Sequence, residues 1–200
     1  MINLKPTMMI GKGLHRECFT HPDSDHLCIK VVTNGNQQET EREQHYYQLL
    51  EKRDISWDML PKFHGNLDTN MGDGAVFDLI RDHDQNTSKT LEFYLNDVQR
   101  FDEIADEILA ALQNLKNYLI RENIITMSIK PKNILFQKQQ NGAGKIIIID
   151  NIGNSDFFPI SSYSRYFGQK KILRKWSNFK NLLRKHYADS PAVVALAENI

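Results

Sequence analysis

The sequence contains 200 residues, of which 40% are hydrophobic and 10% aromatic, and its formal net charge is zero. This composition is typical of a globular chain, and it excludes a disordered or fibrous protein and a generally basic nucleic-acid-binding protein. A chain of this length is long enough for one sizeable core and short for two, so we expect a single folding unit. The sequence has no apolar run long enough to span a membrane and does not start with the basic and then apolar residues of a secretory signal, so we expect a cytoplasmic protein.

The first eighty residues are predicted to form strands around one helix. Short β-branched and aromatic runs, separated by turn-forming residues, predict an antiparallel meander followed by a further hairpin whose turn lies at residues 72–74. The helix has Tyr46, Tyr47, Leu49 and Leu50 on one apolar face, with charged residues elsewhere. We place the strands at residues 8–10, 17–20, 27–32, 60–66 and 75–80, and the helix at residues 39–53.

Helices dominate the remainder of the chain. Apolar residues at spacings of three and four predict a long helix over residues 101–121, preceded by a short one at 90–95. A hairpin loop at residues 141–144 leads into the all-isoleucine strand 146–149. The predicted class is therefore α+β, as one domain with a β-rich N-lobe over residues 1–80, a hinge at 81–86 and a helical C-lobe over 87–200.

The last fifty residues are basic and helical. Residues 157–188 contain eight Lys or Arg residues and no acidic residue, and one face of the helix predicted at 169–187 is apolar. This helix either completes the C-lobe and exposes a solvated basic face, or meets an anionic partner, RNA or a membrane surface. Packing would bury Trp176, whereas a partner surface would leave it exposed. The apolar face consists of Ile172, Leu173, Trp176, Phe179, Leu182 and Leu183.

Short motifs in a fixed order connect these elements to a known family. They are residues 10–13, residues 27–30, residues 130–135 and Asp150. On these motifs the chain resembles, over nearly its whole length, the YrbL family, described as belonging to the PhoP regulatory network. It also resembles a shortened protein-kinase fold, with one helix in the N-lobe and a truncated helical C-lobe. The resemblance implies that the protein binds ATP with magnesium.

The resemblance assigns the nucleotide phosphates to the first two motifs. Gly11 and Gly13 would lay backbone N–H groups over the phosphates, although Arg16 stands where the family pattern has a third glycine; the alternative is an ordinary turn. Lys30 would hold the α- and β-phosphates and pair with Glu43, with Glu39 as the alternative partner. A lysine on an apolar strand needs such a partner unless it extends to solvent from an edge strand.

The later motifs match the metal site of kinases. Asn133 and Asp150 would bind magnesium, and Lys130 would contact the terminal phosphate. Asp150 follows Asn133 by seventeen positions, a spacing spanned by one hairpin, as the kinase layout requires. The alternative for Asp150 is a carboxylate that caps a turn.

The resemblance also implies an adenine pocket, for which ordinary packing is the alternative. The spacing of the two cysteines is not that of metal ligands or of a disulfide framework, and the alternative is that both are small hydrophobic residues buried in the core. The resemblance gives the roof of the pocket to Cys18 and Cys28, the floor to Leu135, the back to Phe77, and the base edge to the backbone of Asp78 and Ile80.

The sequence departs from kinases where the catalytic base should be. Ser128 stands in place of the usual aspartate, and the preceding histidine and arginine are replaced by Thr126 and Met127. A serine hydroxyl is a poor base at neutral pH, and losing such a base costs roughly 10²- to 10⁴-fold in rate. Asn151 either adds a polar metal ligand or starts a turn, and Asp156 is a candidate substitute base.

Three functions remain open from the sequence. The first is a nucleotide-binding regulator of the pseudokinase type, whose state a protein partner senses. The second is an active phosphotransferase with an altered mechanism. The third is a protein-interaction scaffold that kept the fold and lost the nucleotide. Segment 154–159 lacks the usual end signal of an activation segment, and a phosphate there would lack an arginine at position 127 to anchor it.

Overall fold

The computed structural model describes residues 1–33, 37–154, 156 and 159–200, which form two compact units. The first unit comprises Met1–Lys52 and Pro61–Ile80, and the second comprises Arg53–Leu60 and Arg81–Ile200. The loop that follows the first long helix therefore belongs to the second unit. Within these described ranges, no helix is long and apolar enough to cross a membrane.

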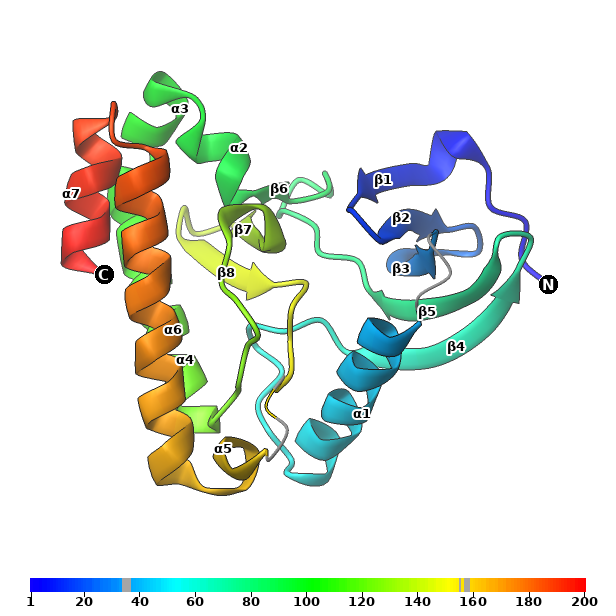
Figure 1. Cartoon of the computed structure of the whole chain (residues 1–200). Coiled ribbons are helices and arrows are strands. Elements are labelled where there is room, and N and C mark those ends of the chain that lie inside the picture. The colour runs from blue at the N-terminus through cyan, green and yellow to red at the C-terminus, as the bar shows by residue number, and fades with distance from the viewer. Residues whose placement is uncertain (34–36, 155, 157–158) are drawn as a thin grey trace. The chain divides into compact units, whose positions relative to one another are not determined.

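The first unit is a five-stranded antiparallel sheet with one long helix (Figure 1). The strands lie in the order β1-β2-β3-β5-β4, so β3 is the central strand. The meander predicted for the first 32 residues is confirmed. The elements are η1 (Pro6–Met8), β1 (Met9–Lys12), β2 (Arg16–His21), β3 (Ser24–Val32), α1 (Gln38–Lys52), β4 (Phe63–Thr69) and β5 (Gly72–Asp78).

The turn between β4 and β5 lies two residues earlier than the sequence predicts. The prediction at 72–74 is wrong, because the Thr69 hydroxyl accepts a hydrogen bond from Met71 N at 3.0 Å and donates one to Gly72 O at 2.6 Å. Gly72 supplies the left-handed backbone, with φ at 100°. Gly74 lies in β5 for a packing reason, because a Cβ there would be 2.5 Å from Ile29 Cγ2.

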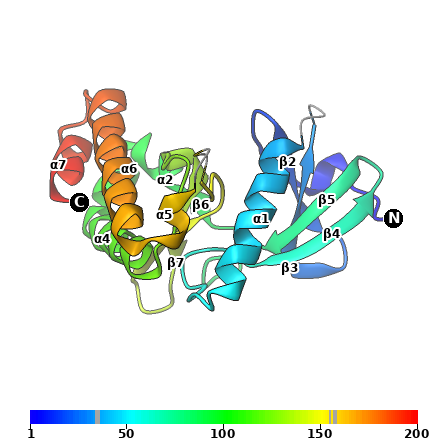
Figure 2. The ribbon, with the colours of Figure 1, turned by 60° about the horizontal axis from the view of Figure 1, so that its bottom comes forward.

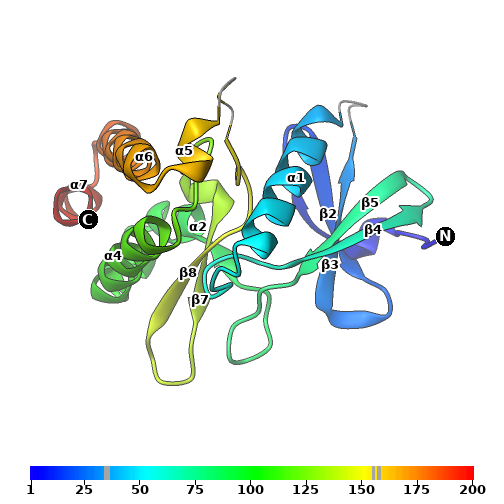
Figure 3. The same ribbon diagram turned by 90° about the horizontal axis from the view of Figure 1, so that it is seen from below.

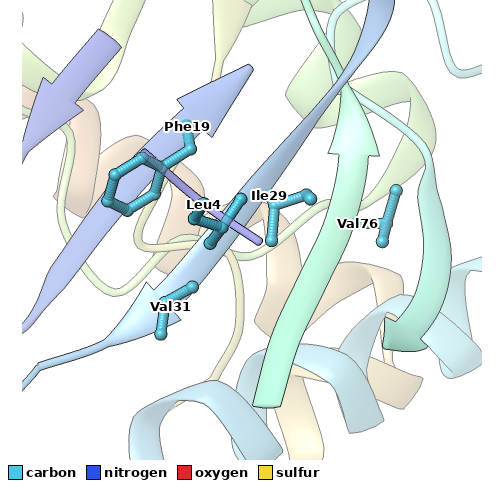
Figure 4. Packing of buried hydrophobic residues seen from close by; sticks show 5 residues of the cluster. All are labelled: Leu4, Phe19, Ile29, Val31 and Val76. Carbon is cyan, nitrogen blue, oxygen red and sulfur yellow. The ribbon is translucent and has the colours of Figure 1, made fainter. Parts of the chain in front are cut away.

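The two faces of this sheet differ in what covers them. On one face Phe19, Ile29 and Val76 lie opposite one another on β2, β3 and β5, and with Leu4 and Val31 they form a hydrophobic cluster (Figure 4). The other face carries α1, which lies along the sheet in Figure 2. Tyr47 of α1 contacts Phe77 of β5 edge-on, with ring centroids 5.4 Å apart. Residues in register with Phe77 therefore share the α1 face.

The second unit is a small sheet with helices packed around it (Figures 1 and 3). Its three antiparallel strands lie in the order β6-β7-β8, and α4 packs against β8, α6 and α7. The predicted α+β class, with a β-rich first part and a helical second part, is confirmed. The elements are β6 (Lys89–Thr90), α2 (Leu91–Leu95), α3 (Val98–Asp102), α4 (Ala105–Glu122), η2 (Pro131–Asn133), β7 (Ile134–Lys138), β8 (Gly144–Ile148), α5 (Ile160–Tyr163), α6 (Arg165–His186) and α7 (Pro191–Asn199).

The helix predicted over residues 101–121 is two helices. Asp97 caps the N-terminus of α3, where its side chain accepts a hydrogen bond from Arg100 N, and the chain leaves helical geometry at Ile104, with φ −137° and ψ 23°. Ile104 N donates to Phe101 O at 3.1 Å, which closes the turn before α4 starts. The apolar spacing of three and four continues across this break, so periodicity alone predicts a continuous helix.

Helix α6 packs its aromatic face against the second unit. The exposed fraction of Trp176 is 2%, and Phe179 and Leu183 are also buried, whereas Leu173 is 48% exposed. The burial of Trp176 is what the packing interpretation of this helix predicts.

Gly168 of α6 marks a close approach between helices. A Cβ at this position would lie 1.8 Å from Asn123 Oδ1 and 2.8 Å from Ser161 O, and Asn123 is the buried, left-handed residue that ends α4. We expect Gly168→Ala to lower the free energy of unfolding by about 1–3 kcal/mol, although alanine is the better helix former. Urea unfolding checks this against the exposed control Ser177→Ala, and a Gly168→Ala variant as stable as that control would contradict the close approach.

Candidate functional site

The β7–β8 hairpin brings Asn133 and Asp150 together. Ile134 and Ile148 are register partners on the two strands, and Ile149 N donates to Asn133 O at 3.0 Å. Asp150 is the next residue along the chain, so its backbone lies one residue beyond this hydrogen bond, although Asp150 follows Asn133 by seventeen positions in the sequence. The isoleucines of the two strands are fully buried, which fixes the hairpin in the core of the second unit.

The donor atoms at this end of the hairpin fit magnesium only in part. Asn133 is 9% exposed, Asp150 is half-buried, and both present oxygen, the ligand atom that Mg²⁺ prefers. Among the residues that the structure describes, no three His, Cys, Asp or Glu side chains gather into a metal cluster. Magnesium typically takes one or two protein ligands together with substrate phosphates and waters, so this pair fits a metal that arrives with a nucleotide.

Ser128 is held by the residue that follows Asp150. Asn151 Nδ2 donates to Ser128 Oγ at 3.0 Å, and Asn151 O accepts from Met127 N at 2.8 Å. Asn151 N also donates to Asp150 Oδ1 at 2.8 Å, and the left-handed φ of 62° makes these contacts compatible. At the position of the usual catalytic aspartate, the neutral Ser128 hydroxyl thus accepts a hydrogen bond from the neutral side-chain amide of Asn151.

Lys130 and Leu135 lie on either side of η2. Lys130 is exposed, and its carbonyl accepts from Asn133 N at 2.9 Å, which closes the turn that positions the asparagine. Leu135 is buried in β7 between its register partners Thr90 and Ile147. Their predicted roles, at the terminal phosphate and beneath the adenine, stay predictions.

Cations of α6 bind the segment after Asp150, which the sequence did not predict. Lys171 is only 6% exposed; its ammonium donates to Asn154 Oδ1 and pairs with Asp156 Oδ2 at 2.6 Å. Lys175 donates to Met127 O, beside Ser128. The available signal was the acid-free basic stretch of the sequence, which does not say which lysines turn inward. Of predicted segment 154–159, positions 155, 157 and 158 lie outside the described residues.

The first unit gathers four predicted residues on the α1 face of its sheet. Cys18 is the register partner of Lys30, and Phe77 is that of Cys28, on adjacent strands. A hydrogen bond with the Cys18 side chain, together with burial, raises the pKa of the Cys28 thiol well above its usual value. Both thiols therefore lie on the same face of the sheet as the lysine and the phenylalanine.

Lys30 lies on the central strand. Strands β2 and β5 flank β3, so the alternative of a lysine reaching solvent from an edge strand is excluded. Its Nζ lies 4.4 Å from the centroid of the Phe77 ring, a cation–π distance. The half-buried ammonium is thus held above the residue predicted to form the back of the adenine pocket.

Glu43 of α1 has a partner that the sequence did not predict. Its Oε2 forms an ion pair with Arg16 Nη1, and Arg16 is the residue that replaces the third family glycine. The carboxylate is 2% exposed, and its Oε1 has no hydrogen-bond partner among the described residues. Glu39 is exposed. Pairing of Lys30 with Glu43 stays a prediction. Arg16 lies on the same face of the sheet as Cys18, because alternate residues of a strand share a face.

The predicted glycine loop is a short turn between β1 and β2. Gly13 N donates to Arg16 O at 2.8 Å, and Lys12 pairs with Glu17 at 2.9 Å. A Cβ on Gly13 would lie 3.3 Å from Arg16 O, and one on Gly11 would make ordinary contact with Cys18. The close Arg16 carbonyl favours a residue without a side chain at position 13. The role of both glycines in binding phosphates stays a prediction.

Asp78 ends β5 with most of its polar groups engaged. Its carboxylate accepts from Lys62 N at 2.8 Å and lies 2.6 Å from His64 Nε2. Its carbonyl accepts a long hydrogen bond from the Cys28 thiol at 3.7 Å, and its N–H donates to Lys62 O. Two residues later, Ile80 is half-buried and ends the first unit. The contact of both backbones with a base edge stays a prediction.

Comparison with known proteins gives one family. The family model described as "PhoP regulatory network protein YrbL" matches residues 2–184. The uncharacterized protein YrbL of Escherichia coli (strain K12) is 35% identical over 182 residues, covering 90% of this chain and 86% of that protein. The YrbL protein of Shigella flexneri matches equally. Among solved structures, the BubR1 kinase domain aligns with a TM-score of 0.49 and 20% identity, covering 71% of this chain and 44% of that one.

Proposed function

The chain belongs to the family of the PhoP regulatory network protein YrbL, and we propose that it acts there as a kinase-like regulator that binds ATP with magnesium and lacks the usual catalytic base. The observation that carries the proposal is the hairpin that sets Asn133 beside Asp150. The predicted family membership is confirmed, whereas nucleotide binding is the proposal.

Each unit contributes one part of the proposed chemistry. Asn133 and Asp150 hold the magnesium that neutralises the phosphates, and Lys130 contacts the terminal phosphate. In the first unit Lys30 binds the α- and β-phosphates from a central strand, with Gly11 and Gly13 in the turn above them. Positioning and charge neutralisation are most of what phosphoryl chemistry asks of a protein, and residues of these types supply both.

The adenine pocket follows the same assignment. The thiols of Cys18 and Cys28 form its roof, Phe77 its back and Leu135 its floor, with the backbone of Asp78 and Ile80 at the base edge. In support, Cys18, Cys28 and Phe77 share one face of the sheet with Lys30.

The residues around Ser128 favour binding without transfer. Its hydroxyl accepts from the neutral amide of Asn151, which leaves no anionic group at the position that accepts the substrate proton in kinases. Asp156, the candidate substitute base, is already engaged in an ion pair with the buried Lys171. Nucleotide binding would then act by stabilising one conformation, which a protein partner recognises.

A thermal titration of the wild-type protein tests the proposal. At a hundred times its dissociation constant, ATP with magnesium should stabilise the fold by about 2.7 kcal/mol, which raises the Tm by roughly 5–11 °C in a chain of this size. Magnesium alone should have no effect, because the two protein ligands do not make a complete site. The absence of any shift at saturating ATP would overturn the proposal and favour a protein-interaction scaffold.

A further inference from the structure

The second unit contains a cavity that the nucleotide proposal does not use. It has a volume of about 390 Å³ and lies where α5 meets the first turns of α6. We call it the α5–α6 pocket. Its polar lining consists of Lys170, Lys171, Arg174, Asp156 and Ser161, and its apolar lining of Ile160 and Phe167.

The charge inside this pocket is unbalanced. Three cationic side chains face one carboxylate, that of Asp156, which is already paired with the buried Lys171. Arg174 makes no hydrogen bond or ion pair with the part of the chain that the structure describes, and Lys170 lies over the Tyr166 ring at 4.3 Å. Burial, followed by the charges of Lys171 and Arg174, lowers the pKa of the adjacent Lys175, as expected in an electropositive environment.

Three cations of α6 line this pocket, and two further along the helix are engaged by backbone carbonyls. Lys175 donates to Met127 O, and Lys180 donates to the carbonyl groups of Glu198 and Ile200 at the end of α7. These two ammonium groups therefore satisfy backbone carbonyls of the same unit. A nucleic-acid backbone needs a line of free cations, whereas a single pocket lined by three cations suits one compact anion.

The walls of the pocket indicate what accompanies that anion. Ile160 and Phe167 line it and are 57% and 52% exposed, so apolar surface lies beside the cations. Arginine and lysine together favour a phosphoryl group, because the guanidinium fork binds its oxygens in pairs while the ammonium neutralises charge. We propose that the α5–α6 pocket binds a dianionic phosphoryl group attached to an apolar body, as in an aryl phosphate or a phosphorylated tyrosine side chain.

Asp156 acts as the intramolecular occupant of this site. Its carboxylate pairs with Lys171, so an incoming phosphoryl group competes with it for the same ammonium. Lys171 also binds Asn154, which follows Asp150 by four residues. Occupancy of the pocket therefore releases Asp156 and changes the contacts of Lys171 with Asn154 and Asp156.

Titration with phenyl phosphate at constant ionic strength tests the pocket. Calorimetry should show saturable binding that weakens about tenfold in Arg174→Gln, through loss of a charge-assisted hydrogen-bond pair. Binding should strengthen several-fold in Asp156→Asn, which removes the competing carboxylate. The matched control is Arg184→Gln, an exposed arginine of the same helix, which should bind as the wild type does.

A second set of titrations separates the pocket from the nucleotide site and identifies the source of the anion. All titrations are repeated in an Asp150→Ala background, where phenyl phosphate binding should persist, and Arg174→Gln should keep its response to ATP with magnesium. Inorganic phosphate and a phosphotyrosine peptide are the comparison probes. If the peptide binds more tightly than phenyl phosphate, the phosphoryl group belongs to a protein; if the two bind equally, it belongs to a small molecule. The proposal would be overturned if Arg184→Gln weakened phenyl phosphate binding as much as Arg174→Gln does. It would also be overturned if an RNA oligonucleotide displaced phenyl phosphate and this displacement required Arg184.

Discussion

Replacing Asp150 with alanine should abolish the stabilisation by ATP and magnesium, a loss of about 2.7 kcal/mol at a ligand concentration one hundred times the wild-type dissociation constant. Asn133, the other proposed ligand, carries no charge, so without Asp150 no protein carboxylate remains to hold the metal. The hairpin itself should survive, because its hydrogen bonds run through Ile149 N and the Asn133 carbonyl. The measurement is the thermal titration with and without magnesium.

The control for this result is Asp189→Ala, which removes an exposed carboxylate from the loop between α6 and α7. It should keep the full shift of the wild type. A wild-type response in Asp150→Ala would show that the nucleotide, if it binds, does not use the hairpin end. A loss of stability without ligand would instead indicate that Asp150 caps the turn, the alternative that the sequence left open.

Restoring a carboxylate at position 128 should give the largest change in activity. Ser128→Asp places an anionic acceptor where Asn151 Nδ2 already donates a hydrogen bond, so the new side chain is held by an existing partner. We expect transfer from radiolabelled ATP, to water or to the protein itself, to rise by roughly 10²- to 10⁴-fold over the wild type.

Ser128→Asn is the matched control, because it has nearly the same size and no charge, and its rate should equal that of the wild type. Combining Ser128→Asp with Asp150→Ala should return the rate to background. If Ser128→Asp binds ATP with magnesium normally and still transfers no faster than Ser128→Asn, then the absence of a base is not what prevents turnover.

Most of the fold and the local geometry of the candidate site could be predicted from the sequence. The alternation of residues along β3 places Lys30 opposite Ile29 and Val31, so strand periodicity alone separates the core face from the α1 face. The glycine-containing loop between an apolar run and an all-isoleucine run predicts the β7–β8 hairpin, and hence the proximity of Asn133 and Asp150 along it. These features depend on neighbours in sequence or on a single turn.

The contacts that sequence reasoning missed depend on tertiary packing. Arg16 reaches Glu43 only because α1 lies on that face of the sheet, and Lys171 reaches Asp156 only because α6 packs beside the segment after Asp150. The break before α4 was missed for the opposite reason. There the apolar pattern continues while the backbone turns at Ile104, so the local signal was present and misleading.

Asn151 combines two requirements that natural variation can separate. Its left-handed backbone suits glycine, asparagine or aspartate, whereas its bond to Ser128 needs a side-chain donor. Across relatives, a glycine here would therefore report that only the turn is kept, and an asparagine that the serine is also held in place. An aspartate beside an unchanged Ser128 would reverse the direction of that hydrogen bond, with the hydroxyl as donor. The residue at position 151 of each relative would thus indicate whether that relative keeps a neutral hydrogen bond at the position of the usual catalytic base.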